Sequence, residues 1–152
     1  SECKVFDVSG HTVGHICYYF KKDNALFCGD TLFSLGCGRI FEGTPLQMSR
    51  SLLKIRSLPN QTKIFCGHEY TESNAKFAFH LEPDSFPLKE KIKDITKKRK
   101  ANKPTVPSVL EDEKKLNPFL KFDNKEYLKK IGLESNAVEE NFRIIRQMKD
   151  QF

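Results

Sequence analysis

Apolar residues in the first 67 positions occur in short runs, several with polar residues alternating between them, and the runs end at turn-forming residues. Runs of four to eight such residues, rich in β-branched and aromatic side chains, are typical of β-strands. The pattern predicts four strands, over residues 4–8, 15–20, 25–28 and 63–66.

One helix interrupts this strand-rich part. Thr44 fits the N-cap position, Pro45 the first helical position and Gln47 the third, so the three residues form a capping box with a favoured proline. Leucine and isoleucine residues follow at helical spacing, and Pro59 marks the end.

From about residue 69 onward the strand pattern gives way to helical periodicity. We expect helices over residues 73–81, 88–100 and 138–149, with the prolines at 83, 87, 104, 107 and 118 in the connections. A strand-rich part followed by a helix-rich part predicts an α/β unit with a small helical domain after it.

Composition fits one domain, or one small domain with an appendage: the chain has 152 residues, of which 38% are hydrophobic and 30% charged. We expect neither a membrane span nor a secretory signal, because no long uncharged apolar run exists. The five cysteines include no C-x-x-C pair, which indicates free thiols in a reducing compartment. The cytoplasm is the expected location; a mitochondrion or another organelle stays open if a targeting segment lies upstream.

The formal net charge of +6 is concentrated in one segment, because residues 89–103 contain eight basic and two acidic side chains. Leu88, Ile92 and Ile95 recur there at helical spacing, so we expect a helix with one packed face and a lysine-rich solvated face. Binding of phosphate or of an anionic partner is the alternative. Nucleic acid is not expected, since no aromatic residues for base stacking are interleaved with the lysines.

Three predicted strands run into a glycine and then into a residue that can bind a metal ion, namely His11, Asp30 and His68. Neighbouring strands would bring these side chains to one edge of a sheet, and two imidazoles with a carboxylate suit zinc or iron. Turn chemistry is the alternative explanation for each position. We expect His15 to be a hydrogen-bonded structural residue and His80 a surface or packing residue.

Longer segments resemble one enzyme family in order and spacing. They are G-H-T-V-G-H at 10–15, G-D-T-L-F at 29–33, G-C-G-R-I-F-E-G-T at 36–44, C-G-H-E-Y-T at 66–71, P-T-V-P-S at 104–108, N-P-F at 117–119 and K-D-Q-F at 149–152. The chain resembles glyoxalase II, hydroxyacylglutathione hydrolase, of the metallo-β-lactamase superfamily, over essentially its whole length.

The resemblance implies that residues 1–70 are the C-terminal half of an αββα sandwich and residues 71–152 a helical substrate-binding domain. The family's upstream H-x-H-x-D-H motif has no counterpart here. We therefore expect this chain to be the C-terminal part of a longer enzyme, or a truncated relative, whose partner is the missing N-terminal half. Two divalent ions are implied, with His11 on one, His68 on the other and Asp30 between them. Zinc is expected, and iron or manganese are alternatives.

The implied reaction is hydrolysis of S-D-lactoylglutathione, or another 2-hydroxyacyl-glutathione, to D-lactate and glutathione by a metal-bridging hydroxide, with no serine or cysteine nucleophile. The resemblance carries glutathione-binding roles to Arg39, Phe41, Tyr70, Arg146 and Lys149. Arg146 and Lys149 would share one helix face as a carboxylate clamp. Phe41 stands where some members have tyrosine, so one ligand hydrogen bond is lost.

Two other functions stay open at this point. One is a persulfide dioxygenase-like enzyme with a single iron, and the other is a non-catalytic fragment or interaction module. For the chain alone we expect no activity and an exposed apolar sheet face that promotes association.

Overall fold

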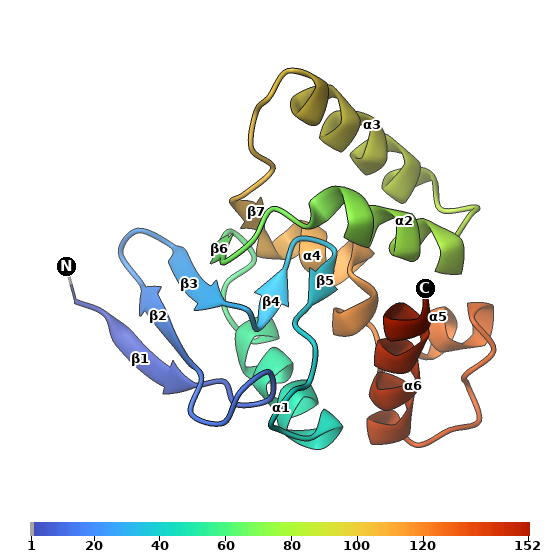
Figure 1. Ribbon diagram of the computed structural model, residues 1–152, viewed down its shortest axis with the longest axis horizontal. Coiled ribbons are helices and arrows are strands. Elements are labelled where there is room, and N and C mark those ends of the chain that lie inside the picture. The colour runs from blue at the N-terminus through green and yellow to red at the C-terminus, as the bar shows by residue number, and fades with distance from the viewer. Residues whose placement is uncertain (1) are drawn as a thin grey trace.

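The computed structural model describes residues 2–152, and Figure 1 shows a small sheet followed by a cluster of helices. The strands are β1 (Lys4–Asp7), β2 (Ile16–Phe20), β3 (Ala25–Gly29), β4 (Leu32–Phe33), β5 (Gly36–Cys37), β6 (Lys63–Cys66) and β7 (Ser108–Val109). The helices are α1 (Pro45–Arg56), α2 (Thr71–Leu81), α3 (Phe86–Lys100), α4 (Leu110–Leu116), the 3₁₀ turn η1 (Pro118–Leu120), α5 (Lys125–Lys130) and α6 (Val138–Gln151).

Five strands form one sheet in the order β1-β2-β3-β6-β7, and β4 pairs with β5 in a separate hairpin. Strands β1, β2 and β3 form an antiparallel meander, whereas β3 and β6 are parallel. A parallel pair needs a crossover, and α1 lies in that crossover. The α/β class predicted for the first part is confirmed.

Helix α1 packs its apolar side against one face of the sheet. Met48, Leu52 and Ile55 are fully buried in the same core as Leu26 of β3 and Ile64 of β6. The helix begins as predicted, because the Thr44 hydroxyl accepts from the Gln47 backbone N–H and the Gln47 side chain accepts from the Thr44 N–H. It ends at Arg56, before Pro59.

The opposite face of the sheet carries a row of apolar side chains, mostly aromatic, and nothing within residues 2–152 covers it. Val5, Tyr18, Phe27 and Phe65 lie side by side in the strand register. Tyr18 is 45% exposed and Phe27 44%, and the Phe27 and Phe65 rings stack at 4.7 Å. An apolar face of this kind marks a contact surface.

The helical part shares its core with the sheet. Phe77 of α2, Phe119 of η1 and Phe142 of α6 belong to the same buried cluster as Leu26 and Ile64. Strand β7 also comes from this part and pairs with β6. The change near residue 70 is therefore a change of secondary structure, not a gap between two cores.

The predicted strands agree with the structure to within one residue at each end, and the three helices to within two. The prediction that all five prolines lie in connections is wrong for two of them. Pro87 lies in the first turn of α3, and Pro118 begins η1. The first turn of a helix tolerates proline. Sequence periodicity missed β4, β5, β7, α4, η1 and α5, which are too short to show a period.

The lysine-rich helix agrees with its prediction. Leu88 and Ile95 are buried while most of the lysines of α3 are exposed. Among residues 2–152, no helix combines the length and apolarity needed to cross a membrane.

Candidate active site

The predicted metal-binding residues meet at one edge of the sheet. Strands β1 and β3 both run antiparallel to β2, and β6 runs parallel to β3. The C-terminal ends of β1, β3 and β6 therefore lie on the same side of the sheet. The Gly67 N–H donates to the Gly29 carbonyl across 2.8 Å, which holds the two strand ends together. Asp30 and His68 follow directly from these glycines.

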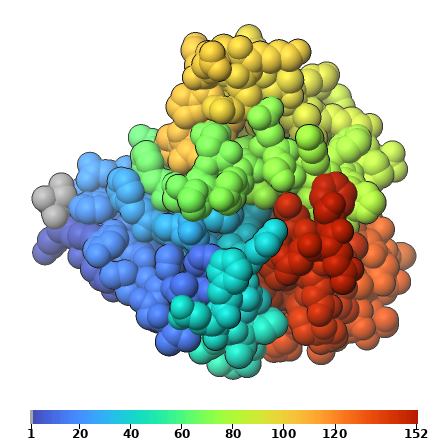
Figure 2. Space-filling model, in the orientation of Figure 1, coloured from blue at the N-terminus to red at the C-terminus, as the bar shows by residue number. Residues whose placement is uncertain are grey.

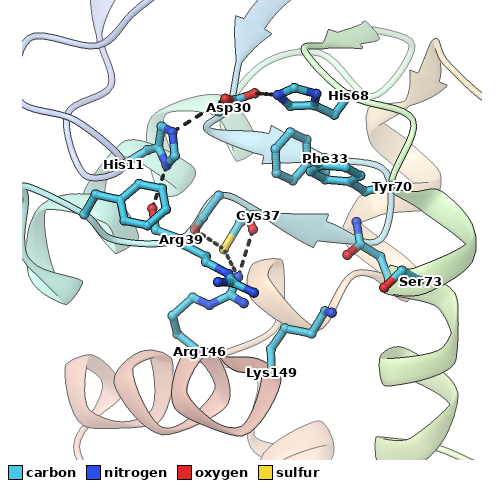
Figure 3. A pocket seen from close by; sticks show the side chains of 13 residues that line it. His11, Asp30, Phe33, Cys37, Arg39, His68, Tyr70, Ser73, Arg146 and Lys149 are labelled. Atoms are coloured by element: carbon cyan, nitrogen blue, oxygen red, sulfur yellow. Dashed lines mark hydrogen bonds and ion pairs between the residues drawn. The ribbon is translucent and has the colours of Figure 1, made fainter. Parts of the chain in front are cut away.

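Asp30 lies between the two imidazoles (Figure 3). Its Oδ2 is 3.5 Å from His11 Nε2, and its Oδ1 is 3.3 Å from His68 Nε2. The side chain of His11 is 15% exposed and that of Asp30 27%, whereas His68 is 47% exposed. One carboxylate therefore connects two imidazoles that do not contact each other.

Two glycines let the backbone pass close to Asp30. A Cβ at Gly67 would lie 2.5 Å from Asp30 Oδ1, so the carboxylate would have to move from its place between the histidines. Gly29 has a φ of 52°, in the left-handed region that glycine adopts without steric cost. The strand-glycine-ligand pattern in the sequence therefore has a steric reason at these two positions.

The three side chains fit divalent metal ions. Two donors that each lie about 2.1 Å from a tetrahedral ion are about 3.4 Å apart. The two Asp30–histidine separations, 3.5 and 3.3 Å, match this spacing. Each ion would have one imidazole and one carboxylate oxygen, so a complete centre requires further donors. Accordingly, within residues 2–152 no three such side chains converge on one point.

His11 is held in the tautomer that metal binding requires. Its Nδ1 lies 2.7 Å from the Arg39 carbonyl oxygen, to which only a protonated nitrogen can donate. That bond leaves the Nε2 lone pair free and directed at Asp30. The Phe41 ring packs on His11 at 5.1 Å and restrains the imidazole further.

The other two histidines are structural, as predicted. His15 Nε2 accepts from the Asp30 backbone N–H at 3.2 Å, so it supports the loop that carries Asp30. His80 packs beside Phe152 at 5.2 Å, on α2.

A single pocket gathers all the residues that the sequence analysis proposed for metal or glutathione binding (Figure 3). Its lining includes His11, Asp30, Arg39, Phe41, His68, Tyr70, Arg146 and Lys149. They come from the sheet edge, the segment after β5, the start of α2 and the C-terminal helix α6. Figure 2 shows α6 in red against the cyan segment after β5, which closes this side of the pocket.

Aromatic rings form the wall next to His68. Tyr70 stacks on His68 with centroids 4.8 Å apart and planes 10° apart. Phe33 of β4 contacts the edge of Tyr70 at 5.3 Å. Tyr70 is half exposed, so its hydroxyl stays available to a bound molecule.

Arg146 lines the pocket together with Lys149, and its side chain is largely buried in the pocket wall. Its side chain is 7% exposed, and its Nη1 donates to the Cys37 carbonyl at 2.8 Å. Its Nη2 pairs with Asp150 at 2.8 Å, and the guanidinium lies over the Phe119 ring. These contacts make Arg146 a link between α6 and β5 at the pocket wall.

Lys149 and Arg39 carry the more accessible positive charges of the pocket. Burial, followed by the charges of Arg146 and Arg39, lowers the pKa of Lys149. The Arg39 side chain is 68% exposed, with its Nε 4.0 Å from Asp150. An anionic ligand would offset the repulsion among these cations.

Sequence patterns missed the residues that hold the pocket floor, the β4–β5 hairpin. Asn74 donates to the Ser34 carbonyl at 3.1 Å, and Asn117 donates to the Phe33 and Gly36 carbonyls at 3.2 and 3.0 Å. Glu113, fully buried, accepts from the Leu35 N–H at 2.8 Å. An apolar-residue pattern cannot find these polar side chains; the N-P-F segment was the available signal for Asn117.

Comparison with known proteins gives the family. Residues 69–152 match the family described as Hydroxyacylglutathione hydrolase C-terminus, and residues 4–68 match the Metallo-beta-lactamase superfamily. The chain belongs to the hydroxyacylglutathione hydrolase family, known as glyoxalase II. Superfamily membership implies divalent metal ions, in agreement with the His11–Asp30–His68 geometry.

Hydroxyacylglutathione hydrolase of Bartonella henselae is 52% identical, over 94% of this chain and 56% of that protein. The Methylococcus capsulatus protein of the same name is 47% identical, over 100% of this chain and 59% of that protein. The chain therefore spans less than two thirds of the length of these relatives.

Solved structures support the fold of this hydroxyacylglutathione hydrolase family member. The BLEG-1 B3 metallo-beta-lactamase is similar with a TM-score of 0.51 and 25% identity, over 78% of this chain and 41% of that chain. ETHE1 from Myxococcus xanthus has a TM-score of 0.55 and 21% identity, over 94% and 44%. The predicted fold class, half of a metallo-β-lactamase sandwich followed by helices, is confirmed.

Proposed function

We propose that this chain is part of a metal-dependent thioester hydrolase. The enzyme would cleave S-D-lactoylglutathione, or another 2-hydroxyacyl-glutathione, to D-lactate or the corresponding acid and glutathione. The observation that carries the proposal is Asp30 between His11 and His68 at metal-ligand spacing, in the same pocket as three basic side chains. Relatives named for this activity support it over the persulfide dioxygenase alternative.

His11, Asp30 and His68 would hold the metal ions, with zinc as the proposed element. Divalent ions at such a site supply a water of lowered pKa and polarise a carbonyl oxygen. The chain's own contribution is orientation, because Arg39 and Phe41 fix the His11 ring and Tyr70 stacks on His68. The leaving thiolate needs no strong acid, since a thiol pKa is about 8.5.

Glutathione carries two carboxylates, and the basic end of the pocket suits them. Lys149 and Arg39 are proposed to bind them, with Tyr70 as a hydroxyl donor. Arg146 lines the same pocket and is proposed to assist them from its wall. In this proposal residues 71–152 form the helical substrate-binding domain, and residues 1–70 carry the proposed metal ligands. The proposed location of the enzyme is the cytoplasm.

The test is Asp30→Ala in the complete protein, which includes the N-terminal half, with two readouts, bound metal and lactoylglutathione hydrolysis. Because each Asp30 oxygen faces a different histidine, we expect both metal equivalents to fall together and hydrolysis to fall at least about 100-fold. His80→Gln, outside the pocket, is the control and should change neither. Full activity with normal metal content in the Asp30 variant contradicts the proposal, and a protein that binds one iron and consumes oxygen favours the dioxygenase.

A further inference from the structure

The segment that comprises α3 and the residues just after it concentrates the net charge of the chain. Residues 89–103 contain eight basic and two acidic side chains, so their difference equals the formal net charge of +6. We use the term cationic face for the exposed side chains of one stripe of this helix: Phe86, Lys89, Lys93, Lys97 and Lys100. No part of this face lines the candidate active site.

Helical geometry places these side chains together. With 3.6 residues per turn, positions 86, 89, 93, 97 and 100 fall within an arc of about 80°. Leu88 and Ile95, which are 0% and 2% exposed, lie on the opposite side and anchor the helix to α2. Figure 1 shows α3 at the outer edge of the molecule, with α2 between it and the remaining helices. The cationic face therefore points away from the protein.

The positive charge on this face is largely uncompensated. Lys91, Lys98 and Arg99 point elsewhere and pair with Asp112, Asp94 and Glu72. On the face itself Lys93 pairs with Glu90 at 2.6 Å. In the part of the chain that the structure describes, no carboxylate lies within ion-pair distance of Lys89, Lys97 or Lys100.

Aromatic side chains accompany the lysines at one end. Phe86 is 70% exposed and Phe79 of α2 is 37% exposed. Together with Ile92 they line a shallow apolar groove, which Lys89, Lys93 and the Lys93-paired Glu90 flank. Folding does not need an aromatic ring this exposed, whereas a ring beside lysines can enter the headgroup region of a bilayer.

We propose that the cationic face docks onto the surface of an anionic phospholipid bilayer. The charge is complementary to acidic headgroups, and lysine stems reach across an interface while their ammonium groups stay in water. The aromatic rings cluster at one end of the helix and do not alternate with the lysines. This arrangement disfavours a nucleic acid as the partner, because successive bases would find no rings to stack on. Docking by α3 leaves the pocket beside α6 open to substrate.

The experiment is flotation with vesicles of phosphatidylcholine alone and of phosphatidylcholine with about 30% phosphatidylserine. We expect partitioning that depends on phosphatidylserine and weakens with salt. Lys89→Glu, Lys97→Glu and Lys100→Glu together should lower it at least about 100-fold, since each basic residue near such a surface contributes about fivefold. Phe86→Ser should lower it about tenfold.

A charge-matched control separates this face from net charge. Lys21→Glu, Lys22→Glu and Lys129→Glu change the total charge equally at exposed positions outside α3. This control variant should retain most of the partitioning of the unsubstituted protein into the phosphatidylserine vesicles. Equal losses in both triple variants, equal binding to neutral vesicles, or binding of duplex DNA in place of vesicles would overturn the proposal. Circular dichroism of each variant verifies that the helices are intact.

Discussion

Asp30 is the residue on which the metal-binding geometry depends, because its two oxygens face two different imidazoles. Sequence spacing predicted that His11, Asp30 and His68 would meet, and the shared strand direction explains why they do. The orientation of His11 by the Arg39 carbonyl could not be predicted, since a backbone acceptor carries no side-chain signature.

Lys149 is the clearest test of substrate recognition at this scale. Lys149→Gln removes a charge that would bind a remote carboxylate equally in the ground state and the transition state. In the complete protein we expect KM for lactoylglutathione to rise about tenfold with kcat nearly unchanged, measured by initial rates. Lys130→Gln, on α5, is the matched control. A fall in kcat alone would contradict this role. Arg146→Ala is less suitable, because it also removes the bond to Cys37 and destabilises the fold.

Glu113 makes stability depend on pH. Burial raises its pKa above the ordinary value of 4.5. A carboxyl group whose pKa is higher in the folded protein than in the unfolded chain destabilises the fold when it is ionised. This loss of stability is absent below the unfolded-state pKa and is complete once the pH has risen past the folded-state pKa. Glu113→Gln keeps the acceptor for Leu35 without the charge.

We therefore expect the Gln variant to be more stable than the parent by about 1 kcal/mol at about pH 8, with the difference vanishing near the ordinary carboxyl pKa. Urea unfolding at several pH values measures it. A constant difference at all pH values would show that the charge is not the cause.

The β4–β5 hairpin is an element that other elements hold in place. Its strands have two residues each, too few to be stable alone, and Asn74, Asn117 and Glu113 satisfy its backbone from the helical part. The floor of the pocket thus depends on side chains from the helical part.

Removing one anchor should show this dependence. Asn117→Ala leaves the Phe33 and Gly36 carbonyls without a donor in a buried site, so we expect a loss of about 2–4 kcal/mol in the free energy of unfolding. The exposed Asn136→Ala should change it by less than about 0.5 kcal/mol. Equal effects of the two substitutions in urea unfolding would argue against the anchoring role.

The whole molecule combines a closed core with one bare sheet face. Tyr18 and Phe27 stand exposed in the middle of the row that Val5 and Phe65 extend. Exposed apolar surface of this extent promotes association. We expect the 152-residue chain alone to self-associate and to show no lactoylglutathione hydrolysis.

Analytical ultracentrifugation of Tyr18→Lys with Phe27→Lys tests the cause of association. The double variant should shift toward monomer, while Phe86→Ser, which removes an exposed ring from α3, should not. A monomeric parent chain that binds two metal ions and turns over substrate would contradict both expectations.

Local signals in the sequence predict the elements that neighbouring residues form. The four strands, the capped helix α1 and the proposed ligand positions after each glycine follow from periodicity, caps and steric needs of neighbouring residues. The tertiary structure alone decided the features that join distant positions. Arg146 meets Cys37 across 109 positions, and Asn117 meets Phe33 across 84. Such contacts depend on how elements pack, and packing leaves no period in the sequence.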